Sequence, residues 1–358
     1  MNALELRGVV LPHAVDRRVF VAGGRITFEP QPDAEVVVEA GFLLPGLVDC
    51  HAHLAISSPA PDDAADDEAV RASASAQLAA GVLALREPGS PNAESRAIGP
   101  ADGLPRVITA GRFVARRGRY FPGLGVEVDE SELADEVERQ VRASGAWAKV
   151  VGDFPGPDGR LAASFSPGAL RDAAERVHAA GGRIAIHAVM AEVIEAAVEG
   201  GFDSIEHGTF MRRDYVEEMA RRGTTWVPTL AISEPIKGFL ASFGMPTDEL
   251  RQARDGIDAL PVTVKAAAEA GVRVLAGTDA GMVPHGLIAR EVELLLRAGL
   301  SGEQAIGAAS WRAREFLGLP GIEEGAPADI VVYTEDPRAD AETLLRPVAM
   351  VLDGRRVR

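Results

Sequence analysis

The chain has 358 residues, 47% of them hydrophobic, with a formal net charge of −16 and one cysteine. This length and composition suffice for one large barrel or two medium domains with a full core. The strong negative charge argues against nucleic acid or an anionic membrane as a partner. A single cysteine excludes an internal disulfide, and the first residues lack an apolar signal core. We therefore expect a cytoplasmic protein that acts on a small molecule and forms a homo-oligomer.

Short apolar runs separated by turn residues fill residues 1–43 and return in residues 320–358. Such runs predict strands. We expect the two segments to meet in one small β-sandwich domain beside a central domain of residues 44–319. The predicted strands are Ala3–Leu6, Val9–Leu11, Arg18–Ala22, Arg25–Phe28 and Glu35–Ala40, followed near the C-terminus by Ala328–Tyr333 and Val348–Arg355.

Between these segments, apolar strands alternate with longer amphipathic runs. Eight such units predict an α/β fold, a (β/α)₈ TIM barrel with its active site at the C-terminal ends of the strands. The stretch Arg112–Asp129 is predicted to be a long loop on that face. The predicted strands are Gly46–His53, Gly81–Glu87, Arg106–Ala110, Trp147–Val151, Arg183–His187, Ser204–His207, Thr225–Thr229 and Arg273–Thr278. The predicted helices are Asp66–Ala80, Glu130–Ala143, Pro167–Ala180, Ala191–Glu199, Asp214–Arg222, Thr247–Ala270 and Gly302–Leu317.

Six polar residues fall within or just after the predicted strands, where they would meet on one face of the barrel. Residues two apart on a strand point the same way, so the first strand would present two imidazoles together. Convergent imidazole and carboxylate groups are typical ligands of divalent transition metals. By the same alternation, Cys50 and Glu206 would face away from the site. The predicted metal ligands are His51, His53, Lys149, His187, His207 and Asp279.

Lys149 and Asp279 each allow two interpretations. Lys149 has small or apolar neighbours, which favour a neutral amine able to form a carbamate with carbon dioxide. The alternative is a lysine paired with a carboxylate such as Asp153. Asp279 could bind a metal and accept a proton from water, or it could cap the following helix.

These residues resemble the amidohydrolase superfamily of metal-dependent hydrolases, in the order His-x-His, Lys, His, His, Asp. The sequence around them is similar to that of the branch that holds imidazolonepropionase-like enzymes and Xaa-Pro dipeptidases. Two features depart from that branch. The loop after the third strand lacks a Gly-Gly-His motif, and the strand that carries Lys149 continues with Gly152-Asp153-Phe154-Pro155-Gly156. The motifs that carry the resemblance are Pro45–His53, Ile205–Thr209, Gly277–Gly281 and Gly325–Val332.

The resemblance implies two divalent ions, with Zn²⁺ expected first and Mn²⁺, Co²⁺ or Fe²⁺ left open. His51, His53 and Asp279 would hold one ion, His187 and His207 the other, and a carbamate on Lys149 would bridge them. A bridging hydroxide would attack the carbonyl carbon, and Asp279 would pass the proton to the leaving amine. The implied substrate is a dipeptide, for example of Xaa-Pro type, or an N-acyl amino acid.

Substrate contacts are predicted in the loops. Tyr120 could donate a hydrogen bond to the substrate, and Arg112 or Arg119 could pair with a substrate carboxylate, although a solvated arginine is the simpler interpretation. His285 could face the pocket or make a structural hydrogen bond. Two further functions stay open on this sequence. One is a cyclic amide, lactone or aryl amide hydrolase, or a deaminase, and the other is a metal-binding protein without turnover.

Overall fold

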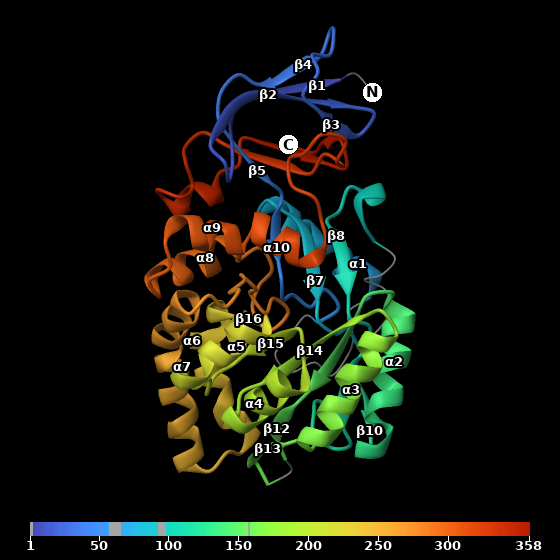
Figure 1. The fold of residues 1–358 in the computed structure, drawn as a ribbon, viewed down its shortest axis with the longest axis vertical. Helices are drawn as coiled ribbons and strands as arrows, with labels where there is room; N and C mark the ends of the chain where they lie inside the picture. The colour runs from blue at the N-terminus through green and yellow to red at the C-terminus, as the bar shows by residue number, and fades with distance from the viewer. Residues whose placement is uncertain (1–2, 57–65, 92–97, 157) are drawn as a thin grey trace.

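The computed structural model describes residues 3–56, 66–91, 98–156 and 158–358. Figure 1 shows a sheet at one end of the molecule, coloured blue and red, built from both ends of the chain. Below it lies a larger body of parallel strands and helices. None of the helices in the described ranges combines the length and the apolar content that a membrane span needs.

The terminal sheet is joined where β5 (Phe42–Pro45) pairs antiparallel with β17 (Ile330–Tyr333), which sets Leu43 opposite Val332. Its order is β19-β18-β17-β5-β1-β2-β3, with β4 paired to β1. The two strands expected over residues 3–11 are a single strand. One face of the sheet buries its own apolar cluster, which includes Leu6 and Val351. The other strands are β1 (Leu4–Val10), β2 (Val15–Ala22), β3 (Arg25–Thr27), β4 (Glu35–Val38), β18 (Ala349–Leu352) and β19 (Arg355–Arg356).

The parallel strands form two sheets, β6-β7-β8 and β10-β9-β11-β14-β15-β16. Seven of the eight predicted strands are confirmed, two of them without a change of bounds, because buried parallel strands read as near-continuous apolar runs. Their bounds are β6 (Leu47–Asp49), β7 (Val82–Glu87), β8 (Arg106–Thr109), β11 (Trp147–Val151), β14 (Arg183–Ala188), β15 (Ser204–His207) and β16 (Thr225–Val227). A small hairpin, β12 (Asp153–Pro155) and β13 (Leu161–Ala163), follows β11.

The predicted eighth strand, Arg273–Thr278, is extended but forms no regular ladder. It hydrogen-bonds on both sides: Trp226 N donates to Arg273 O at 2.9 Å, and Cys50 N donates to Ala276 O at 2.9 Å. Ala276 N instead donates to Ala308 O, outside both sheets, which interrupts the ladder. The segment therefore links the last strand of the six-stranded sheet to the chain beyond β6.

The stretch Arg112–Asp129, which has three glycines, is not the irregular loop that was expected. It contains β9 (Phe113–Arg116) and β10 (Gly125–Val128), which pair with each other in parallel. Strand β9 also pairs with β11, which places Phe113 beside Lys149. The first part of this stretch thus carries an aromatic ring to the site.

Six predicted helices are confirmed with small shifts of their ends, two of them preceded by a short 3₁₀ turn. The predicted helix Gly302–Leu317 is wrong as a single helix, since Ser310 is not helical and its hydroxyl donates to Pro45 O at 2.7 Å. Two helices were not predicted, α6 (Ser233–Phe239) and α8 (Ile288–Arg297), nor were several 3₁₀ turns, among them η6 (Leu240–Phe243). The others are α1 (Asp67–Ala79), α2 (Leu133–Ser144), α3 (Pro167–Ala179), α4 (Ala191–Gly200), α5 (Val216–Arg222), α7 (Thr247–Glu269), α9 (Gly302–Ala308) and α10 (Trp311–Leu317).

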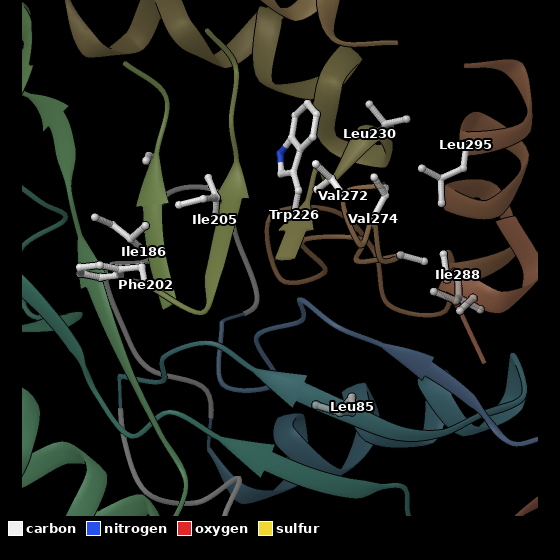
Figure 2. Close-up of a cluster of buried hydrophobic side chains, with 14 of the residues drawn as sticks. Leu85, Ile186, Phe202, Ile205, Trp226, Leu230, Val272, Val274, Ile288 and Leu295 are labelled. Carbon is white, nitrogen blue, oxygen red and sulfur yellow. The ribbon is translucent and has the colours of Figure 1, made fainter. Parts of the chain in front are cut away.

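Strand alternation places neighbouring residues of one strand in different core clusters. Side chains such as Ile186, Ile205 and Trp226 belong to the large cluster that packs strands against helices (Figure 2). Ala185 and Val227, next to two of these residues in sequence, lie in a separate buried cluster. Because successive residues point to opposite sides of a strand, the side that carries Ala185 also carries His187. This side leads to the candidate site.

Candidate active site

His51, His53 and Asp279 converge just past the end of β6. His51 Nε2 lies 3.2 Å from His53 Nε2, and Asp279 Oδ1 lies 3.3 Å from His51 Nε2 and 3.4 Å from His53 Nε2. All three side chains are buried. Although burial acts to raise the pKa of Asp279, the adjacent His51 and His53 hold that pKa well below its usual range. Asp279 is therefore an ionised carboxylate facing two imidazoles.

His207 joins this group through an unusual backbone conformation. Its φ is +66°, outside the strand region, so the alternation along β15 stops before it. The prediction that Glu206 faces away from the site is therefore wrong, and Glu206 contacts His51. His51, His207 and Asp279 each offer a ligand atom within 4.8 Å of the other two. Burial is the main cause that lowers the pKa of His207 well below its usual range.

Each of three imidazoles has its Nδ1 occupied. His51 Nδ1 lies 2.7 Å from Glu206 Oε2, His53 Nδ1 lies 2.8 Å from Gly89 O, and His207 Nδ1 lies 2.9 Å from Thr229 Oγ1. A hydrogen bond at one ring nitrogen fixes the tautomer and leaves the other nitrogen as a lone-pair donor. The Nε2 atoms of His51 and His53, which face each other and Asp279, are thus prepared to bind a cation.

Lys149 and His187 complete the predicted set. Lys149 lies on β11 and is 1% exposed. Burial lowers its pKa to about 8, and nearby Arg86 acts in the same direction. His187 packs against His207 with ring centroids 4.6 Å apart, and its Nε2 is 3.7 Å from Asp153 Oδ1. Burial lowers the pKa of His187 to about 3. All six predicted ligands line one cavity.

The cavity beside these residues has a volume of about 160 Å³ and walls that are mainly apolar. Phe113, Phe121 and Phe154 line it together with Tyr120, the only predicted substrate contact among its lining residues in the described ranges. Burial raises the pKa of Tyr120. Its further walls come from α6, η6 and α7: Ile236, Leu240, Phe243, Ala253, Ile257 and Leu260.

The other three predicted substrate contacts lie elsewhere. The Arg112 guanidinium donates to Gly125 O at 3.2 Å, and Arg119 Nη1 contacts Phe154 O at 3.5 Å. His285 is partly buried with its Nδ1 3.4 Å from Gln77 Nε2, and burial lowers its pKa to about 4. None of these three side chains is among the residues that line the cavity, and each engages another protein group instead.

Comparison with known proteins identifies this arrangement. The sequence model described as "Amidohydrolase family" matches residues 42–357. The chain belongs to the amidohydrolase family. An uncharacterized protein of Mycobacterium tuberculosis is 39% identical over 355 residues, covering 98% of this chain and 95% of that protein. As a member of this family, the protein is a hydrolase that acts on carbon–nitrogen bonds.

Two further comparisons concern proteins with named activities. The crystal structure of a Xaa-Pro dipeptidase with methionine bound in its active site superimposes with a TM-score of 0.85 at 22% identity and covers 99% of each chain. The ochratoxinase of Aspergillus niger is 28% identical over 230 residues, which cover 61% of this chain and 47% of that enzyme. Its crystal structure gives a TM-score of 0.81 at 20% identity and covers 99% of this chain and 95% of that chain. At these identities the structural matches show a common fold.

Amidohydrolases typically depend on divalent metals, and the donor set of this chain fits such ions. The atoms that converge are imidazole nitrogens and a carboxylate oxygen, which are ligands that zinc and its neighbours accept. The opposite ring nitrogens are held by a carboxylate, a carbonyl and a hydroxyl, as is usual for metal-bound histidines. The residues around His51, His207 and Asp279 thus form a candidate metal site of this amidohydrolase.

A buried ion pair beneath the ligands was missed in the sequence. Arg86 on β7 donates through Nη2 to both carboxylate oxygens of Glu206 at 2.7 Å, and its Nη1 donates to Ser204 Oγ at 3.0 Å. Arg86 and Glu206 have no exposed surface. A charged residue inside the apolar run Val82–Glu87 was the available signal, because buried charges need partners.

A second buried carboxylate holds the backbone that carries the ligands. Asp49 Oδ1 accepts hydrogen bonds from His51 N at 3.1 Å and from Thr278 N at 3.0 Å. Gln77 Nε2 donates to its other oxygen at 3.0 Å. Asp49 therefore ties the segment with His51 to the segment with Asp279, which are more than 200 positions apart in sequence.

Proposed function

We propose that this amidohydrolase cleaves an amide bond with the help of two divalent metal ions. His51, His53 and Asp279 would hold one ion, His187 and His207 the other, and Lys149, as a carbamate, would bridge them. The observation that carries this proposal is the convergence of the Nε2 atoms of His51 and His53 on Asp279, with each Nδ1 engaged elsewhere. Zn²⁺ is the expected metal, and Mn²⁺, Co²⁺ and Fe²⁺ suit the same donors.

Each of these residues would have its own role in the hydrolysis. Divalent ions held there would acidify a water molecule and polarise the substrate carbonyl. Asp279, ionised and buried, would accept the proton of that water and deliver it to the leaving amine. Lys149 would supply an anionic bridge, because its lowered pKa leaves a large fraction of the amine neutral near pH 8. Glu206 would keep His51 in the tautomer that offers Nε2.

Two substrate classes compete at this site. The fold shared with a Xaa-Pro dipeptidase supports a dipeptide or an N-acyl amino acid. The apolar cavity beside the candidate ligands favours a second class, aryl amides without charge.

We also propose that residues 44–319 close into a (β/α)₈ barrel. The hydrogen bonds that segment 273–276 makes with Trp226 and Cys50 support this closure. Residues 1–43 and 320–358 would form the small β domain.

Metal analysis of three proteins tests the proposal. The wild type, purified without chelator in bicarbonate buffer, should carry about two equivalents of transition metal per chain. Lys149→Ala should lose metal and amide hydrolysis together, whereas Lys265→Ala, a change at an exposed helical lysine, should keep both. A fully metallated, active Lys149→Ala variant would refute the bridging role. Wild-type protein that stays metal-free after metal is added back would refute the proposal as a whole.

A further inference from the structure

An arc of aromatic rings spans the cavity between two candidate ligands. We call Phe113, Tyr120, Phe121, Phe154 and Phe243 the aromatic arc. The ring of Phe113 contacts that of His53, with centroids 5.1 Å apart. The centroids of Phe154 and His187 lie 6.2 Å apart. Inside the arc, successive centroids lie 5.1–5.4 Å apart. A substrate whose amide reaches the candidate metal site must therefore place a substituent against these rings.

The arc is assembled from distant segments, and this argues that it is a binding surface. Phe113 lies on β9, Phe154 on β12 and Phe243 in η6, while Tyr120 precedes β10. Apart from Phe113, its members are half-buried, although burying such rings completely would stabilise the fold. Each half-buried ring keeps apolar surface available to a ligand inside the cavity.

The size and charge of the cavity restrict the class of ligand that it can bind. Its volume of about 160 Å³ is close to the ~150 Å³ of an apolar protein cavity that binds benzene. Among the lining residues in the described ranges, Lys149 is the only lysine or arginine. The guanidinium groups of Arg112 and Arg119 contact backbone carbonyls instead. A free substrate carboxylate would find no guanidinium group in these walls.

The geometry points to an uncharged amide with one phenyl-sized apolar substituent as the substrate class of this enzyme, in preference to a dipeptide. This inference rests on the proposed amide hydrolysis and sharpens it. The ring would pack edge-to-face within the aromatic arc, where pairs of rings gain free energy beyond the area they bury. The amide carbonyl would then face the candidate metal site.

Equilibrium binding to metal-free protein tests the ring site separately from catalysis. The probes are acetanilide, N-methylacetamide, which has the same amide without the ring, and the dipeptide glycylproline. Calorimetry should show acetanilide binding at least about tenfold tighter than N-methylacetamide, the gain expected from burying an aromatic side chain. Glycylproline binding as tightly as acetanilide would overturn the inference.

Variants of the aromatic arc provide the second arm. Phe243→Ala should weaken acetanilide binding about two- to tenfold, and Phe243→Leu, which keeps most of the apolar volume, should weaken it less. The matched control is Phe28→Ala, because Phe28 contacts Arg17 beside the terminal sheet and is remote from the cavity. Unchanged acetanilide affinity in a folded Phe243→Ala variant would also overturn the inference.

Turnover by metal-loaded protein separates this inference from the proposed function. Faster hydrolysis of acetanilide than of glycylproline would support both. Faster hydrolysis of glycylproline would overturn the substrate class and leave amide hydrolysis standing. If neither amide were hydrolysed, the proposed function would fail, and binding to the metal-free protein would still decide whether the aromatic arc binds a ring.

Discussion

The polar floor of the site and the aromatic arc beside it are built by opposite means. The floor consists of Arg86, Glu206, Asp49 and Thr278 beneath the ligands, and directional hydrogen bonds of 2.7–3.1 Å hold it in place. The aromatic arc is held by ring contacts with centroids 5.1–5.4 Å apart. Contacts between buried charges tolerate little change, whereas the ring contacts bury mainly apolar surface and accept substitutions of similar volume better.

This difference assigns separate roles to the two regions. The floor comes from strand ends and fixes the ligands, so it determines which reaction is possible. The aromatic arc comes largely from connecting segments, which vary most between relatives and commonly carry specificity. Changes in the floor should therefore affect every substrate alike, and changes in the aromatic arc should affect substrates according to their rings.

The largest effect is expected at Asp279. In Asp279→Asn the side-chain amide cannot accept a proton from water. The kcat should therefore fall on the order of 10²–10⁴-fold for all amide substrates. The matched control is Asp172→Asn, an exposed position on α3, which should keep wild-type kcat. Steady-state kinetics with metal content measured in parallel checks this. A variant that keeps most of its kcat would require another proton acceptor.

A smaller effect, on metal affinity, is expected at Glu206. Glu206→Gln removes the carboxylate that faces His51 Nδ1, so metal affinity should fall roughly 10–100-fold. Glu206→Asp keeps the charge and should lose less, and Glu175→Gln at an exposed position on α3 should lose nothing. Competition with a chelator measures the affinity, and circular dichroism verifies the fold. Wild-type metal affinity in Glu206→Gln would mean that the floor only supports packing.

The six candidate ligands, which remain a prediction, could be assigned to one side of the fold because each lies in or shortly after an apolar run that the sequence shows. His187 ends a run that alternation describes correctly, and Lys149 lies in a strand predicted with its true bounds. Glu206 could not be placed in this way. The positive φ of His207 breaks the alternation, and the Glu206 partner, Arg86, is 120 positions away.

Apart from Tyr120, which was predicted to contact substrate, the aromatic arc was out of reach of sequence patterns. Its rings meet only after β9, β12 and η6 are brought together, and the turn of η6 lies in a segment for which no helix was predicted. Phe243 has no motif around it. Likewise, the eighth strand was predicted from its apolar run, but the hydrogen bond from Ala276 to Ala308 depends on tertiary contacts.

The smallest effect is expected at Glu291, whose buried carboxylate is hydrogen-bonded to backbone N–H groups, whereas that of Glu206 is paired with Arg86. Glu291 on α8 accepts hydrogen bonds from Leu230 N at 3.0 Å and Ala231 N at 2.6 Å. Burial raises its pKa to about 8, Asp49 adds to the rise, and the two N–H groups and Arg290 oppose it. In the floor, by contrast, Arg86 and His51 outweigh burial and keep the pKa of Glu206 well below its usual range.

The pH dependence of stability follows from this raised pKa. Between the ordinary glutamate pKa of 4.5 and the raised pKa of about 8, the folded state binds a proton at Glu291 that the unfolded state has released. Stability therefore falls as pH rises through this window. Glu291→Gln cannot titrate, so the Tm of metal-free wild type should decline between pH 5 and pH 8 relative to the variant by about 2–4 °C. Thermal unfolding monitored by circular dichroism measures both curves. Parallel curves would mean that the two backbone N–H groups stabilise the Glu291 carboxylate as effectively as Arg86 stabilises Glu206, which would remove the contrast between paired and unpaired buried carboxylates.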